Sequence, residues 1–171
     1  MSTVTVLGID PGSRVTGIGI VAGKASVLQY CYSASVRTGN GPLAERLAII
    51  YGALSEAIKI HQPDAVAIEQ VFVARNPRSA LVLGHARGSA LLAAVNHGLP
   101  VTEYSALQIK RSVVGTGSAT KKQVQHMVQV LLSLQRKPAL DAADGLACAI
   151  CHLHTSASLA RITAASRLVG T

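Results

Sequence analysis

The order of apolar patterns along the chain constrains the fold more than any other feature of the sequence. Residues 4–9 and 16–21 are short apolar runs, and the turn signal Asp10-Pro11-Gly12-Ser13 separates them. This arrangement predicts a β-hairpin. A third strand is expected within residues 26–36, because Val and Tyr are frequent there.

From residue 42 onward, helix and strand patterns alternate. Leu43, Leu47, Ile50, Leu54 and Ile58 recur at three- and four-residue steps, which predicts an amphipathic helix. Similar patterns predict strands at residues 65–68 and 101–104 and helices at residues 79–96, 105–114, 119–134 and 139–154. The order predicts an α/β fold, with a mixed five-stranded sheet of three antiparallel and then parallel strands, flanked by helices.

Length and composition favour a single domain. The 171 residues are 49% hydrophobic, which is enough for one real core. We expect the domain to span residues 1–155 and a flexible basic tail to span residues 156–171.

The sequence shows no secretory signal and no apolar run near the roughly 20 residues of a membrane span. Three cysteines are too few for a disulfide framework, so we expect a cytoplasmic protein.

The chain is basic although few of its residues are charged. Sixteen Lys and Arg residues outnumber eight Asp and Glu residues, which gives a formal net charge of +8. Such an excess favours a polyanionic partner, above all a nucleic acid.

Four of the eight acidic residues stand where a charge is costly. Asp10 and Glu69 each end an apolar strand, and Asp141 and Asp144 share one face of an apolar helix. Unpaired carboxylates at such positions would cost several kcal/mol or would bind protons. If the elements converge, the four side chains form an oxygen-rich pocket suited to two Mg²⁺ or Mn²⁺ ions, the arrangement that hydrolyses phosphodiesters. Taken singly, the acids could also be solvated strand ends, a helix cap or surface groups.

Five motifs follow one another between residues 4 and 154. They are residues 8–17 (GIDPGSRVTG), 67–72 (AIEQVF), 84–88 (GHARG), 113–119 (VVGTGSA) and 141–144 (DAAD). As an ordered set they closely resemble the RuvC family of bacterial Holliday-junction resolvases. The resemblance implies a ribonuclease-H-like fold and a metal-dependent crossover junction endodeoxyribonuclease. It also implies paired symmetric nicks in four-way DNA junctions during homologous recombination and repair.

The same resemblance assigns roles to single residues. It implies that Asp10, Glu69, Asp141 and Asp144 bind two Mg²⁺ ions, which Mn²⁺ can replace, and that Lys110 and Lys121 act near the scissile phosphate. Phe72, the only Phe, matches an aromatic residue that contacts the junction, and a lone aromatic in a basic loop can stack on an unpaired base. Further candidate DNA contacts are Arg14, Arg75, Arg78 and Lys122.

The family also implies partners. It predicts a homodimer, for which the small residues around Gly84 and Gly88 offer a close helix contact, although the same surface could pack on the protein's own sheet. It further predicts a functional link to the RuvA–RuvB branch-migration complex and a cleavage preference around TT steps.

Three other interpretations of the sequence compete with this one. Asp10-Pro11-Gly12-Ser13 also resembles the phosphate loop of actin-like ATPases, but those need two such domains. A non-catalytic junction-binding module explains the basic charge but explains the four carboxylates less well. Residues 148–152 (CAICH) read as a haem attachment motif, and His154 adds a candidate zinc ligand, yet the motif lies within an apolar helix and there is no second cysteine pair for zinc.

Overall fold

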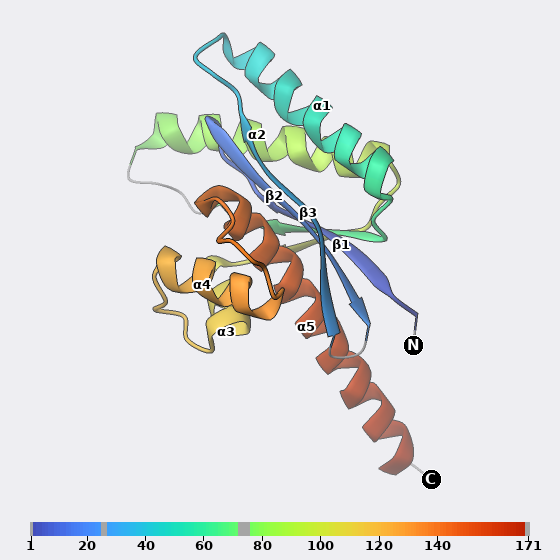
Figure 1. The fold of residues 1–171 in the computed structure, drawn as a ribbon. Helices are drawn as coiled ribbons and strands as arrows, with labels where there is room; N and C mark the ends of the chain where they lie inside the picture. The colour runs from blue at the N-terminus through green and yellow to red at the C-terminus, as the bar shows by residue number, and fades with distance from the viewer. Residues whose placement is uncertain (1, 25–26, 72–75, 170–171) are drawn as a thin grey trace.

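A five-stranded mixed sheet forms the centre of the protein, seen here in a computed structural model that describes residues 2–24, 27–71 and 76–169 (Figure 1). The strands lie in the order β3-β2-β1-β4-β5. The elements are β1 (Val4–Asp10), β2 (Val15–Lys24), β3 (Val27–Arg37), α1 (Leu43–His61), β4 (Ala65–Glu69), α2 (Pro77–Asn96), β5 (Val101–Tyr104), α3 (Ala106–Val114), α4 (Lys121–Leu131) and α5 (Leu140–Val169).

Strand directions confirm the predicted architecture. β1, β2 and β3 pair in antiparallel fashion, whereas β4 lies parallel to β1 and β5 lies parallel to β4. Each parallel step is made across a helix, α1 before β4 and α2 before β5, as parallel strands require. The predicted α/β class with three antiparallel strands followed by parallel ones is therefore correct.

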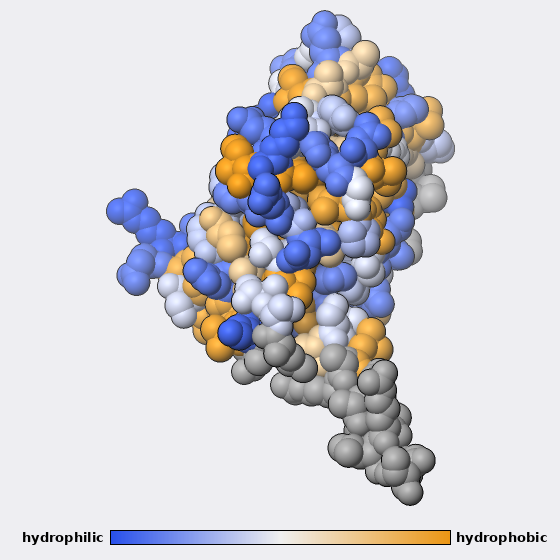
Figure 2. All heavy atoms as spheres, turned by 90° about the vertical axis from the view of Figure 1, so that its right-hand side faces the viewer, coloured by the Kyte–Doolittle hydropathy of each residue, from blue (hydrophilic) through white to orange (hydrophobic). Residues whose placement is uncertain are grey.

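Helices cover the sheet on both faces. Figure 1 shows α1 and α2 on one side of the sheet and α3, α4 and α5 on the other. Alternate residues of a strand point to opposite faces, so Ile9 and Ile18 pack in the core under α1 and α2. Val6 and Val21 pack in the core under α5. On the face turned to the viewer in Figure 2, apolar residues are interleaved with polar ones at the level of α1 and α2.

Local signals explain where the central helices begin and end. Ser105 and Thr120 form capping boxes with Gln108 and Gln123 at the starts of α3 and α4. Gly115 ends α3 in the left-handed conformation with φ of 89°, which glycine adopts without strain. The helix expected at residues 119–134 is therefore shorter at both ends.

The last helix is longer than the sequence predicts. The expected end was near His154, but α5 continues to Val169 and extends beyond the sheet (Figure 1). Small and polar residues after Thr155 weaken the apolar pattern without breaking a helix, since no Pro or Gly intervenes before Gly170. Thr155 Oγ1 and Ser158 Oγ also donate hydrogen bonds to carbonyl oxygens one turn earlier, at 2.8 and 2.9 Å.

None of the helices within the described ranges is long and apolar enough to cross a membrane. Cys31 is exposed, whereas Cys148 and Cys151 lie on α5 and are buried in the core between this helix and the sheet. All three are free thiols. The cysteines of the haem-like motif thus pack as small apolar side chains.

Candidate active site

Two carboxylates meet at one edge of the sheet because β1 and β4 are adjacent parallel strands. Ile9 pairs with Ile68 in the register, and Asp10 and Glu69 directly follow them as the last residues of the two strands. Side chains alternate between faces, so Asp10 and Glu69 both point toward the α5 side of the sheet. The condition on which the oxygen-rich pocket depended, that these two strands are neighbours, is therefore met.

Three helices complete a pocket around this strand edge. The pocket has a volume of about 180 Å³ and is lined by Asp10, Glu69, Ala106, Ile109, Lys110, Lys121, Val124 and Asp144. α3 supplies Lys110, α4 supplies Lys121, and α5 supplies Asp144. Asp141 lies one turn earlier on α5 and is not among the lining residues, but its charge acts on Asp10.

Burial makes the strand-end carboxylates unusually weak acids. It raises the pKa of Glu69 from 4.5 to about 7, and the negative charges of Asp10 and Asp144 add to the effect. Burial likewise raises the pKa of Asp10 from 3.8 to about 6, assisted by Asp144 and Asp141. Both shifts arise first from burial, which disfavours the charged carboxylate, and then from repulsion by the neighbouring carboxylates.

Two lysines supply the local positive charge. Lys121 Nζ donates a hydrogen bond to Asp144 Oδ2 at 2.7 Å, and this ion pair raises the pKa of Lys121. Lys121 also lowers the pKa values of Asp10 and Glu69, and Lys110 lowers that of Glu69. The ammonium group of Lys121 therefore partly offsets the negative charge of the carboxylates.

The donor set fits divalent metal ions in its chemistry. The acidic side chains offer only oxygen ligands, which Mg²⁺ and Mn²⁺ prefer, and a bound cation would offset both the burial and the mutual repulsion that raise the pKa values of Asp10 and Glu69. Across the described ranges, no three Asp, Glu, His or Cys side chains are grouped closely enough to bind one ion as they stand. The fit thus rests on the chemistry of the donors.

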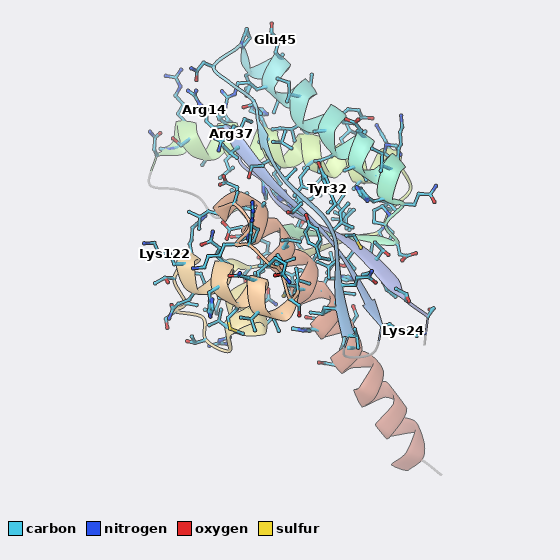
Figure 3. The ribbon with its side chains drawn as sticks, in the orientation of Figure 1. Arg14, Lys24, Tyr32, Arg37, Glu45 and Lys122 are labelled. Atoms are coloured by element: carbon cyan, nitrogen blue, oxygen red, sulfur yellow. The ribbon has the colours of Figure 1, made fainter. Side chains whose placement is uncertain are left out.

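The predicted DNA contacts are distributed over several elements. Arg14 lies in the β1–β2 loop and donates a hydrogen bond to Asn40 Oδ1, and Lys122 is exposed on α4. Figure 3 shows Arg14 and Arg37 near one end of the sheet, with Lys122 on the same side of the molecule. Arg78 is exposed in the first turn of α2. Phe72 and Arg75 lie outside the described residues.

Sequence reasoning missed the side chains that hold the loop after Asp10. Arg46 Nε donates to Ser13 O at 3.1 Å, and Thr38 Oγ1 donates to the same oxygen at 2.9 Å. Thr16 Oγ1 donates to Gly12 O at 2.8 Å. Thr16 and Thr38 are both buried, but only the tertiary structure reveals their partners.

Carboxylates at the ends of adjacent strands of a mixed sheet, faced by carboxylates on a helix, define the ribonuclease-H-like class of proteins. This protein has that arrangement. A family model described as crossover junction endodeoxyribonuclease RuvC matches residues 6–152. The chain belongs to the RuvC family.

Curated relatives and solved structures agree with this assignment. The crossover junction endodeoxyribonuclease RuvC of Marinobacter nauticus is 55% identical over 92% of this chain and 90% of its own length. That of Pseudomonas aeruginosa is 56% identical over 90% and 88%, respectively. The Thermus thermophilus RuvC structure in complex with a Holliday junction substrate is 35% identical and superposes with a TM-score of 0.85, covering 91% of this chain and 96% of that one. The predicted ribonuclease-H-like fold and family are confirmed.

Proposed function

We propose that this protein is a structure-specific endonuclease that resolves four-way DNA junctions in homologous recombination and repair. The pocket that brings Asp10, Glu69 and Asp144 together beside two lysines carries the proposal. Membership in the RuvC family supports the junction as substrate, because a relative of similar fold is described in complex with one. The net charge of +8 supports binding to the phosphate backbone.

Each acidic residue has a role in this proposal. Asp10, Glu69, Asp141 and Asp144 hold two Mg²⁺ ions, for which Mn²⁺ can substitute. When bound, the ions activate a water molecule and stabilise the leaving oxygen of the phosphodiester. Asp10 and Glu69 must lose their protons to serve as ligands, so their raised pKa values make metal binding dependent on pH.

The basic residues orient the DNA. Lys110 and Lys121 line the pocket and hold the scissile phosphate. To contact the phosphate, Lys121 gives up its ion pair with Asp144. Arg14, Arg78 and Lys122 contact the backbone farther from the cut. Phe72 and Arg75 complete the junction contact, with Phe72 stacked on an unpaired base.

We further propose that the protein acts as a homodimer through α2. Three large apolar side chains are exposed along one face of this helix: Leu81 (64%), Leu92 (53%) and Val95 (64%). Gly84 and Gly88 lie between them, and a Cβ atom at either position would meet nothing within 4 Å. Two active sites related by a two-fold axis suit two symmetric nicks.

The remaining proposals rest on the sequence patterns and on the family resemblance. We place the protein in the cytoplasm, where it works with the RuvA–RuvB branch-migration complex. Residues 1–155 constitute the nuclease domain, and residues 156–171 form a basic tail in which α5 continues to Val169.

Cleavage of a labelled synthetic four-way junction tests the proposed activity. Wild type and the Asp10→Asn variant are compared in Mg²⁺ and in EDTA, with a linear duplex of the same sequence as substrate control. Glu56→Gln is the matched variant, because Glu56 is an exposed carboxylate on α1 outside the pocket.

We expect paired nicks in the junction from wild type and Glu56→Gln with Mg²⁺, and none from Asp10→Asn, which should still bind the junction. Binding without cleavage by the wild type in Mg²⁺ and in Mn²⁺ would leave a non-catalytic junction-binding protein. Joint loss of binding and cleavage in Asp10→Asn would point to a structural role for Asp10.

A further inference from the structure

The backbone of α5 lies directly against the backbones of β1 and β2. A Cβ atom at Gly17 would stand 1.9 Å from Asp141 O, one at Gly8 would stand 2.1 Å from Gly145 O, and one at Gly19 would stand 2.3 Å from Leu146 N. All three atoms belong to the main chain of α5, so no side-chain rotation could relieve the overlap. The helix can lie at this depth only because these strand positions lack a side chain.

Of these three glycines, Gly17 lies directly beside one of the proposed metal ligands, Asp10. It is the cross-strand partner of Asp10 in the β1–β2 ladder and faces the same side of the sheet. The atom above it is the carbonyl oxygen of Asp141, and Asp144 follows one turn later on α5. A side chain at residue 17 would therefore move α5, with Asp141 and Asp144, away from the strand that carries Asp10.

Backbone preference alone does not explain a glycine here. Glycine in a strand interior costs roughly 0.5–1 kcal/mol relative to alanine, because more backbone entropy is lost on folding. β2 nevertheless has glycine at residues 17 and 19, its positions nearest the pocket on the α5 side. At the far end of β2, the atoms nearest to a Cβ at Gly23 all belong to the side chain of Leu153, with Leu153 Cδ2 at 2.8 Å. The main-chain contacts are thus concentrated beside the carboxylates.

We propose that Gly17 is a positioning residue that sets the depth of α5 and thereby the spacing between the strand carboxylates and the helix carboxylates. Gly8, Gly19 and Gly145 extend the same close contact along the helix. This inference rests on the proposed function, because it assigns the spacing a role in binding the metal ions.

The test compares Gly17→Ala with Gly23→Ala. Both positions lie on the same strand and the same face beneath the same helix, but only the first contacts the main chain of α5. Binding of Mn²⁺ to the protein without DNA is measured by the loss of the free-ion electron paramagnetic resonance signal. Junction affinity in EDTA and the Mg²⁺ concentration that half-saturates cleavage are measured alongside.

For Gly17→Ala we expect at least tenfold weaker Mn²⁺ binding and a higher half-saturating Mg²⁺ concentration, with junction affinity in EDTA within twofold of wild type. Gly23→Ala should keep wild-type values within twofold. Gly145→Ala serves as a milder second variant, because its Cβ would stand 2.7 Å from Ile18 C and alanine favours the helix. It should stay folded and bind Mn²⁺ more weakly than wild type.

Two outcomes would overturn the inference while leaving the proposed function intact. In one, wild type binds Mn²⁺ and cleaves, and folded Gly145→Ala does so equally well. In the other, Gly23→Ala loses metal affinity as much as Gly17→Ala. A wild type that neither binds Mn²⁺ nor cleaves the junction would instead overturn the proposed function, and the inference with it.

Discussion

At the scale of single residues, the protein holds two carboxyl groups in conditions that disfavour their charge. The raised pKa values of Glu69 and Asp10 mean that the folded state binds protons more tightly than the unfolded chain. The stability that these groups contribute is therefore complete below about pH 4 and is lost as the pH rises through about 7. The proposed role of these two carboxylates as charged metal ligands thus opposes the stability of the fold at neutral pH.

Glu69→Gln should remove much of this pH dependence. Between pH 5 and pH 8 in EDTA, we expect wild type to lose about 2 kcal/mol more free energy of unfolding than the variant, because only wild type must ionise a buried group with a pKa of about 7. Denaturant titrations at several pH values measure the difference. Glu56→Gln should follow wild type, and parallel pH curves for wild type and Glu69→Gln would contradict the argument.

Lys121 should set the acidic limit of activity. Its charge lowers the pKa values of both Asp10 and Glu69, so Lys121→Gln should shift the acidic limb of the cleavage profile toward higher pH. Loss of its contact to the phosphate should also slow cleavage at pH 7 on the order of 100-fold. Rates measured from pH 6 to pH 9 check both effects. Lys122→Gln, at the adjacent exposed position, should leave the limb in place, and a shift of equal size there would argue for a general surface-charge effect.

At the scale of elements, the loop between β1 and β2 is held by contacts from outside the hairpin. Thr38 follows β3, yet its hydroxyl group donates to Ser13 O and its backbone N–H donates to Arg14 O at 3.1 Å. Arg46, from α1, donates to the same Ser13 oxygen. The chain segment that leaves Asp10 is thus fixed by hydrogen-bond partners that lie 24 to 33 positions away in the sequence.

Thr38→Val should loosen this loop. The substitution preserves the shape of a buried side chain but leaves the Ser13 oxygen short of one donor, which should cost about 1–2 kcal/mol of stability. Thr38→Ser keeps the hydroxyl group and should recover most of the loss. Thermal unfolding of the three proteins measures the effect. Equal destabilisation by Val and Ser would show that the methyl group, and not the hydrogen bond, is responsible.

The same distinction between local and tertiary signals explains what could be predicted from sequence. The apolar periods that place Asp10 and Glu69 at strand ends are local, so both positions were predicted correctly. The contact of Arg46 with Ser13 joins distant segments, and no pattern in one sequence indicates it. The extension of α5 beyond His154 was missed because small polar residues neither favour nor break a helix strongly. The alternating glycines of β2 can be seen in the sequence. That α5 packs directly on Gly17 is a tertiary contact, which only the structure reveals.

At the scale of the whole molecule, positive charge and pocket position predict how DNA is held. The sequence carries a net charge of +8, whereas the site itself is acidic, so the phosphate backbone must be attracted mainly by residues around the pocket. Lysine and arginine contacts release counterions from DNA, and junction affinity should therefore fall steeply with salt. The exposed apolar face of α2 lies on the other side of the sheet from α3 and α4, which leaves both surfaces accessible together (Figure 1).

Leu92→Glu should convert a dimer into a monomer. Its side chain is 53% exposed in the single chain, and burying a glutamate in an apolar contact between two copies would cost several kcal/mol. Val130→Glu is the matched control, because Val130 is also 53% exposed but lies on α4. Light scattering at micromolar concentration should give a dimer mass for wild type and Val130→Glu and a monomer mass for Leu92→Glu. Junctions cut by Leu92→Glu should then carry unpaired nicks, because two active sites are no longer held on one junction. An unchanged dimer mass for Leu92→Glu would place the contact between copies elsewhere than on α2.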